Sequence, residues 1–248
     1  MIDRLVNSAP IQTNPDGLSG EEPRARRRLG LVERERQILD GAIQFFARHG
    51  FGGQLRDLAR SIGVTHALLY HYFPTKQALI DRVYDEVFVG RWKPEWALWL
   101  DDRSLDIEDK LTAFYADYVN TVLTHDFVRI LVFSGLTDHT ITDRFFSLLG
   151  ERLFPRLIRE TRRYRALTSR AKATAREMEL LLGLHGSFFY IGMRRWIYGQ
   201  GEPPPGAAQA YDESHVRDRV RAYLQASRAL FAVTVGPAKT AGRSKPRR

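Results

Sequence analysis

Residues 54–76 contain two short helical patterns separated by one glycine, and no other feature of the chain constrains its fold as strongly. Apolar residues repeat at helical spacing before Gly63, and a second helical pattern begins at Thr65. Because glycine adopts a left-handed backbone at little cost, a tight turn is expected at Gly63. Helices over 54–61 and 65–71 joined by such a turn predict a helix-turn-helix, the motif that places its second helix in the major groove of DNA.

Further helices are expected on both sides of this motif. A helix over 31–49 is predicted from its helical spacing of apolar residues, and Gly50 supplies a stop. Pro74 breaks the chain, and Thr75 is a candidate cap for a helix over 75–91. The residues of the motif that should pack against the first of these helices are Leu55, Leu58, Val64, Leu69 and Phe73.

The remaining sequence also predicts helices, near 94–101, 105–124, 127–137, 141–166, 170–199 and 210–233. No segment shows the period-two alternation of a strand, so the predicted fold class is all-α. The chain is predicted to divide into a three-helix DNA-binding domain over 31–78 and a larger helical domain over 79–235. Residues 1–30 are predicted to be a flexible basic arm, and residues 236–248 a basic disordered tail.

Composition narrows the function classes. The net charge of +9 favours a polyanionic partner such as nucleic acid. The absence of cysteine excludes disulfides and thiolate metal sites. No apolar run approaches the roughly 18 residues of a membrane helix, and no signal peptide is evident, so a cytoplasmic protein without a membrane partner is expected. No nucleophile elbow, Walker loop, dinucleotide motif or metal-spaced histidines occur, so we expect no enzyme, cofactor or metal site.

The exposed side of the helix over 65–71 is expected to contact DNA, because it is polar and aromatic and has no acidic residue. Thr65 and His66 can hydrogen-bond to base edges. Ala67 or Leu68 can touch the methyl group of a thymine.

Arg56, in the first turn of the preceding helix, can reach a guanine or a phosphate. The other predicted DNA-binding residues are Gln54, Tyr70, His71, Tyr72 and Lys76. The two tyrosines and the lysine are suited to phosphate oxygens. The alternative is that the two histidines are merely exposed and that Tyr70 only packs.

Three groups of residues share the pattern of a known family. They are Ile38, Ala42, Phe45-Phe46 and His49-Gly50-Phe51; then Arg56-Asp57-Leu58-Ala59 and Gly63-Val64; then Leu69-Tyr70-His71-Tyr72-Phe73-Pro74-Thr75-Lys76 and Leu79. Residues 31–85 thereby resemble the N-terminal domain of TetR-family transcriptional repressors. The family usually has Thr-Thr or Thr-Ser at the start of the second helix. Here Phe51-Gly52-Gly53-Gln54 stands in its place.

The resemblance implies a regulatory domain from about residue 90 to residue 235. Such a domain binds a small ligand and forms a homodimer through its last two long helices, so that two recognition helices read a palindromic operator. Repression is the usual outcome in the family. The ligand would act by moving the helix over 75–91, which joins the two domains.

Aromatic residues make up most of the candidates for the ligand pocket. These candidates are Trp92, Trp96, Trp99, Phe114, Tyr115, Tyr118, Phe133, Phe146, His185, Phe188 and Tyr190. The alternative is that they belong to an ordinary core, in which aromatic residues also repeat at helical spacing. The candidates for the dimer interface are Leu181, Phe189, Val220, Leu224 and Phe231.

One rival function stays open at this point. The arginines of residues 24–28 and the basic tail would also suit a nucleoid-associated protein that binds DNA without sequence preference.

Overall fold

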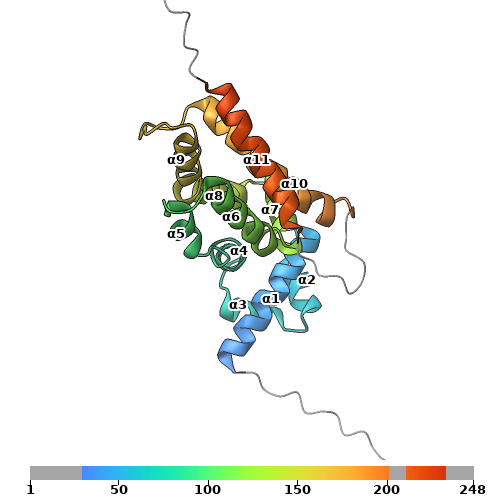
Figure 1. Ribbon diagram of the computed structural model, residues 1–248. Coiled ribbons are helices and arrows are strands. Elements are labelled where there is room, and N and C mark those ends of the chain that lie inside the picture. The colour runs from blue at the N-terminus through green and yellow to red at the C-terminus, as the bar shows by residue number, and fades with distance from the viewer. Residues whose placement is uncertain (1–29, 201–210, 233–248) are drawn as a thin grey trace, which may run out of the picture.

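The computed structural model describes residues 30–200 and 211–232, and every regular element in these residues is a helix (Figure 1). The elements are α1 Leu31–His49, α2 Leu55–Ser61, α3 His66–Tyr72, α4 Lys76–Tyr84, the π-helical η1 Asp85–Val89, α5 Glu95–Asp101, α6 Ile107–Val122, α7 His125–Gly135, α8 Thr140–Arg152, α9 Phe154–Tyr164, α10 Ala175–Trp196 and α11 Glu213–Leu230. The predicted all-α class is confirmed. Apart from Gly30, the predicted arm lies outside the described residues, as does the predicted tail over 236–248.

The small N-terminal domain packs α1, α2 and α3 around one apolar core. Ile38 and Phe46 of α1, Leu58 of α2 and Leu69 of α3 have no exposed surface. Each such burial is worth about 1.5–3 kcal/mol, so these four side chains hold the three helices together. Gly63 has a φ of +68°, the left-handed conformation expected at the turn between α2 and α3.

Helix α4 joins the two domains. It begins at Lys76 because the Thr75 hydroxyl accepts a hydrogen bond from a first-turn amide at 3.0 Å. Leu79 and Val83 are fully buried, and α4 packs against α1. The boundary predicted between residues 78 and 79 therefore falls inside a helix that belongs to the small domain at its start. The same helix continues through η1 into the core of the larger domain.

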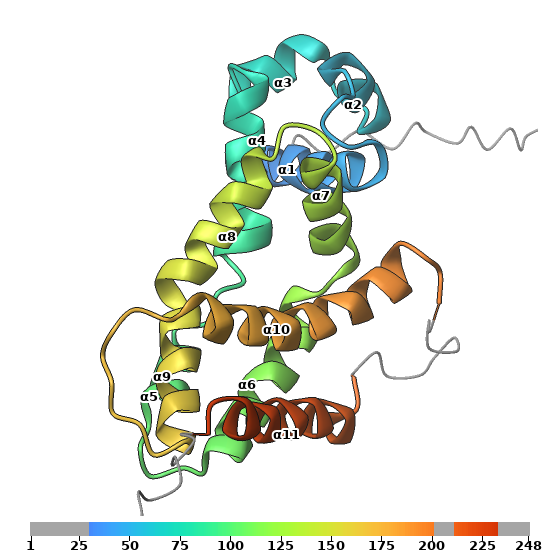
Figure 2. The same cartoon turned by 90° about the horizontal axis from the view of Figure 1, so that it is seen from above.

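The larger domain places two of its helices between the small domain and the C-terminal helices. Figure 2 shows α7 and α8 leading from α1 and α4 towards α10, and α10 running beside α11. Helix α7 contacts both α1 and α10, and α6 packs against α11. No helix in the described part of the chain combines the length and the apolarity needed to cross a membrane.

One predicted helix is in fact two. The segment over 141–166 divides into α8 and α9 at Leu153. The reason is Pro155, which lacks an amide N–H and is tolerated only in the first turn of a helix, where the structure places it. The two short helices can thus turn relative to each other, which brings α9 against α5, α6 and α10.

The predicted helix over 170–199 starts later, at Ala175, because Thr174 and Glu177 form a capping box. Arg162 of α9 binds the Glu177 carboxylate at 2.6 Å and the carbonyl of Ala171 at 2.6 Å, which fixes the preceding loop. The hydrogen bonds from Arg162 hold the pKa of Glu177 well below its usual range. The loop and the helix start are therefore set by one buried ion pair.

Candidate functional site

Helix α3 presents one side to solvent. Thr65, His66, Ala67, Tyr70 and His71 are exposed, whereas the opposite side of the helix is anchored in the core. The Thr65 hydroxyl accepts a hydrogen bond from a first-turn amide at 3.1 Å, which fixes the start of the helix. The rings of His66 and Tyr70 meet edge to face with their centroids 4.7 Å apart.

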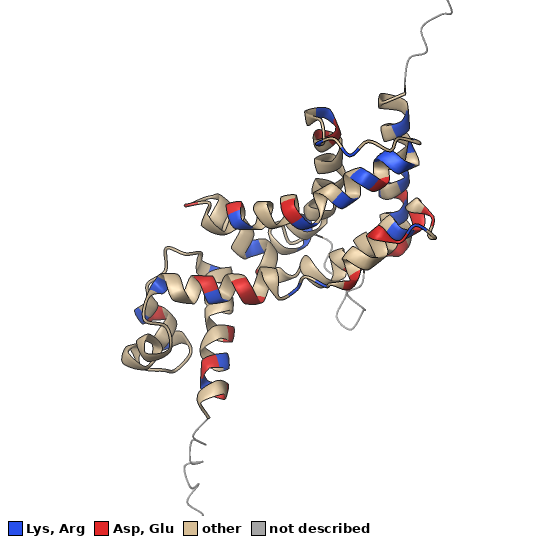
Figure 3. Ribbon diagram, turned by 90° about the vertical axis from the view of Figure 1, so that its left-hand side faces the viewer, with Lys and Arg blue, Asp and Glu red and all other residues tan. Residues whose placement is uncertain are grey.

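The exposed side of α3 carries no acidic residue and no lysine or arginine. Its ribbon is tan in Figure 3 because α3 contains no Lys, Arg, Asp or Glu. Leu68 and Tyr72 are half-buried, so they line the margin of this surface. On α2, Gln54 and Arg56 are exposed, and the neighbouring Asp57 is paired with Arg60 at 2.9 Å. No unpaired carboxylate of these two helices would therefore repel a polyanion at this surface. The surface also offers groups that can hydrogen-bond to base edges.

Lys76 makes a contact within the protein that the sequence did not predict. Its Nζ donates to the carbonyl of Phe51 and, at 3.0 Å, to the carbonyl of Gly53. Both carbonyls lie in the loop between α1 and α2, and Gln54 makes no side-chain cap at the start of α2. Lys76 therefore links α4 to this loop. The phosphate contact stays a prediction.

A cavity of about 280 Å³ lies between α6, α7, α8 and α10. Its lining consists of Tyr118, Leu131, Val132, Thr142, Phe145, Phe146, Leu182, His185, Gly186 and Phe189. Phe146 lines the cavity and is also 47% exposed, so the cavity reaches the surface at this residue. A mostly apolar cavity with a few polar groups is the usual form of a small-molecule site.

The polar groups of the cavity are uncharged at neutral pH. Tyr118 Oη and His185 Nε2 lie 3.3 Å apart and form a hydrogen bond. Burial lowers the pKa of His185 to about 4, and burial raises the pKa of Tyr118. The Thr142 hydroxyl donates to the carbonyl of Leu131 at 3.3 Å.

Of the predicted pocket residues, Tyr118, Phe146 and His185 line this cavity, and the other eight do not. Trp96, Phe114 and Phe188 are fully buried. Trp96 meets Phe114 and Trp92 at centroid distances of 5.5 Å and 5.4 Å, Phe188 stacks on Tyr115 at 4.3 Å, and Phe133 packs over Gly50. The rings named here pack against other residues outside this cavity, and a role in ligand binding stays a prediction for them.

Sequence reasoning missed most of the lining. Leu182, Gly186 and Phe189 repeat along one side of α10 together with His185, and this spacing was the available signal. Apart from Phe146, no comparable signal marks the lining residues of α7 and α8, because their approach to α10 depends on tertiary packing.

The predicted dimer residues need a correction. Leu181 and Val220 have no exposed surface and Leu224 is 1% exposed, so they are packed inside the subunit and cannot meet a second copy. Phe189 lines the cavity. Phe231 is half-buried, with the guanidinium of Arg165 4.4 Å from its ring centroid.

The outward sides of α10 and α11 instead form a groove of about 570 Å³. Its lining consists of Arg176, Glu179, Leu180, Gly183, Leu184, Ser187, Arg219, Ala222, Tyr223, Ala226 and Leu230. A Cβ atom at Gly183 would meet nothing within 4 Å, so the surface is open at its centre.

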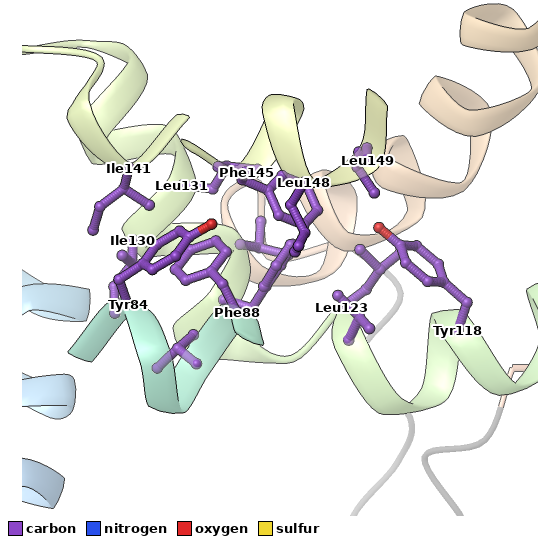
Figure 4. Packing of buried hydrophobic residues seen from close by; sticks show 14 of the residues in the cluster. Tyr84, Phe88, Tyr118, Leu123, Ile130, Leu131, Ile141, Phe145, Leu148 and Leu149 are labelled. Atoms are coloured by element: carbon purple, nitrogen blue, oxygen red, sulfur yellow. The ribbon is translucent and has the colours of Figure 1, made fainter. Parts of the chain in front are cut away.

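The cavity is connected to the small domain through packed side chains (Figure 4). Phe145, which lines the cavity, contacts Phe88 of η1 at a centroid distance of 5.5 Å. Phe88 stacks on Tyr84 of α4 at 5.3 Å. Arg144 of α8 lies 3.8 Å from the centre of the Tyr84 ring and pairs with Asp81 of α4 at 2.7 Å. Helices α8 and α4 are therefore in direct side-chain contact.

A three-helix domain with an exposed helix α3, joined through a shared helix to a larger helical domain with an internal cavity, defines a two-domain helix-turn-helix protein. The family model described as "Bacterial regulatory proteins, tetR family" matches residues 38–83, from α1 to α4. Residues 38–83 of this chain therefore match the N-terminal domain of the tetR family of bacterial regulatory proteins.

Individual relatives agree with this assignment. The HTH-type transcriptional regulator LuxR of Vibrio harveyi is 38% identical over 65 residues, which cover 26% of this chain and 32% of that protein. The HTH-type transcriptional repressor KstR2 of Rhodococcus jostii (strain RHA1) is 25% identical over 134 residues, which cover 52% of this chain and 62% of that protein. The match therefore spans less than two thirds of the length of either relative.

A solved structure extends the likeness to the whole fold. The TetR-like transcriptional regulator from Rhodococcus sp. RHA1 superposes with a TM-score of 0.53 at 18% identity, over 82% of this chain and 99% of that chain. At this identity the likeness concerns the fold alone.

Proposed function

We propose that this chain is a DNA-binding transcriptional regulator, not an enzyme, and that it acts in the cytoplasm. It reads an operator with the exposed side of α3. The observation that carries the proposal is the anchored, polar surface of Thr65, His66, Tyr70 and His71, which has no acidic residue. Groups of this kind hydrogen-bond to base edges and phosphates, while the net charge of +9 favours approach to DNA.

The operator is palindromic and is bound by a homodimer. One recognition helix reads only a few base pairs, so a two-fold pair of small domains gives the specificity that a single one lacks. The groove between α10 and α11 is the proposed interface, with a second copy of this chain as its occupant. Its lining is mostly apolar and includes Arg176, Glu179 and Arg219, a mixture that suits a protein interface.

Two glycine variants test the interface. Gly183→Trp places a ring in the groove, whereas Gly150→Trp places it on α8 outside that groove, and neither Cβ would meet an atom within 4 Å. We expect sedimentation to show a dimer for the unmodified chain and for Gly150→Trp, and a monomer for Gly183→Trp. A dimer of undiminished stability in Gly183→Trp would refute this interface.

A small molecule in the cavity releases the operator. Filling the cavity displaces Phe145 and α8, and the contacts of Arg144 with Asp81 and Tyr84 carry the displacement to α4. The ligand thereby favours a state in which the two copies of α3 no longer fit adjacent grooves. The coupling free energy expected for such a device is about 1–3 kcal/mol. The regulator is proposed to be a repressor, in line with the name of the relative KstR2.

Selection of genomic DNA fragments by the purified full chain at near-physiological salt, followed by sequencing, tests the proposal. We expect one enriched palindrome. His66→Ala removes a base-reading side chain and should lower operator affinity by about 1–3 kcal/mol. His215→Ala, at an exposed residue of α11, is the matched control and should leave affinity unchanged.

The second candidate is a nucleoid-associated protein that binds DNA without sequence preference, favoured by the net charge of +9. Diffuse recovery of fragments, with affinity that depends steeply on salt and not on sequence, would support it and refute the operator. In that case His66→Ala should not alter the relative affinity for different fragments.

A further inference from the structure

The cavity offers no charge to a ligand. None of its lining residues is Asp, Glu, Lys or Arg. The Thr142 hydroxyl is already engaged with the carbonyl of Leu131 at 3.3 Å. A charged group that entered would lose its water without gaining a counter-ion, which costs several kcal/mol.

The Tyr118–His185 pair is the polar feature of the cavity. Tyr118 Oη and His185 Nε2 share one hydrogen bond at 3.3 Å. Nδ1 of His185 has almost no accessible surface and no hydrogen-bond partner among the described residues, so a ligand group reaches it by displacing one of the side chains around it. A buried polar atom without a partner is unfavourable, so a ligand that satisfies it gains affinity.

The nature of the missing group follows from the chemistry of imidazole. If Tyr118 donates to Nε2, Nδ1 carries the proton and is a donor; if His185 donates to Tyr118, Nδ1 is an acceptor. A hydroxyl group both donates and accepts, so it pairs with Nδ1 in either tautomer. A carboxylate only accepts and an ammonium only donates, and each brings a charge that the lining cannot balance.

We infer that the cavity binds an uncharged, mainly apolar molecule with one hydroxyl group, which pairs with Nδ1 of His185. The inference rests on the proposed function only in taking this cavity as the effector site. The volume of about 280 Å³ is near the lower limit of ligand pockets, which favours a compact body such as two fused rings.

Four compounds with one naphthalene body test the inference on the full chain without DNA. They are 2-naphthylmethanol, 2-naphthoate, 2-naphthylmethylammonium and 2-methylnaphthalene, titrated at pH 7 by calorimetry. We expect the alcohol to bind roughly a hundredfold more tightly than either ion, because the ions are desolvated without a partner. It should bind about tenfold more tightly than the hydrocarbon, because of one hydrogen bond.

Variants locate the site. His185→Phe keeps a ring but removes both nitrogens, so the alcohol should lose its advantage over the hydrocarbon. Gly186→Leu fills the cavity, whereas Gly150→Leu adds the same side chain to α8 outside it; neither Cβ would meet an atom within 4 Å. Binding of the alcohol should be lost in Gly186→Leu and retained in Gly150→Leu.

Three results would overturn the inference: an ion that binds as tightly as the alcohol, a hydrocarbon that binds as tightly as the alcohol, or an alcohol that shows no saturable binding. The series on the unmodified chain decides these outcomes whether or not a variant folds. Operator release is measured separately. An alcohol that binds without releasing the operator refutes the regulatory proposal and leaves the ligand class standing.

Discussion

Replacement of Lys76 by methionine should weaken the small domain by disconnecting α4 from the loop between α1 and α2. Methionine keeps most of the aliphatic stem but removes the ammonium that binds the carbonyls of Phe51 and Gly53. A hydrogen bond with a charged partner contributes about 1.5–3 kcal/mol when buried. Lys76 is half-buried and water can replace part of the loss, so we expect the free energy of unfolding to fall by about 1–3 kcal/mol in total.

Thermal unfolding followed by circular dichroism measures this loss. For a chain of this size about 1 kcal/mol corresponds to 2–4 °C, so the expected fall in Tm is about 2–12 °C. Lys93→Met is the matched control. Lys93 pairs with Asp117 at 2.7 Å, but its side chain is 41% exposed, and such surface pairs contribute less than about 1 kcal/mol.

Binding to the operator at several salt concentrations separates the loop contact from a phosphate contact. If Lys76 serves the loop, Lys76→Met weakens operator binding while the slope of log affinity against log salt stays unchanged. If Lys76 neutralises a phosphate, the slope falls by about 1. An unchanged Tm together with a reduced slope would refute the loop contact as its main role.

Three further predictions concern stability. The side chain of Lys110 is fully buried and pairs with Glu160, and its Nζ also donates to the carbonyls of Leu100 and Asp102. Lys110→Met should cost about 3–5 kcal/mol in urea unfolding, and adding Glu160→Leu should recover the part that comes from the unpaired carboxylate; equal losses in both variants would contradict a desolvation origin. Burial lowers the pKa of His185 to about 4 from 6.5, so the unfolded chain binds the proton more readily. As the pH falls from 6.5 to 4, this histidine should therefore lower the free energy of unfolding by roughly 1.4 kcal/mol for each pH unit, and it should have no effect above pH 6.5. His185→Phe should remove this part of the dependence on pH. Gly53→Ala should lower Tm because its Cβ would lie 2.5 Å from a Phe45 ring carbon. Gly52→Ala is the control and should leave Tm unchanged, because its Cβ would meet nothing within 4 Å. An equal Tm for the two variants would count against this packing.

Local chemistry explains what the sequence predicted well. The turn at Gly63 and the helix starts at Thr65 and Thr75 depend on residues within a few positions of each other, and the structure has all three. The same holds for the exposed side of α3, since its orientation follows from the apolar side chains on the opposite side. The break at Pro155 was also a local signal, and overlooking it merged α8 with α9.

The larger domain shows where sequence reasoning ends. Helical spacing identifies apolar residues but does not indicate which neighbour covers them. From the sequence, Leu181 and Val220 could have faced either a second copy or their own subunit. In the structure they face their own subunit. The aromatic candidates met the same ambiguity, and Tyr118, Phe146 and His185 were distinguished from the rest only by the approach of α7 and α8 to α10. The sequence by itself determined the all-helical class, the helix-turn-helix and its exposed residues, because these depend on contacts along the chain. Tertiary structure alone decided the position of the cavity, the outward groove and the loop contact of Lys76, because each depends on side chains that are distant in sequence and meet only when the helices pack.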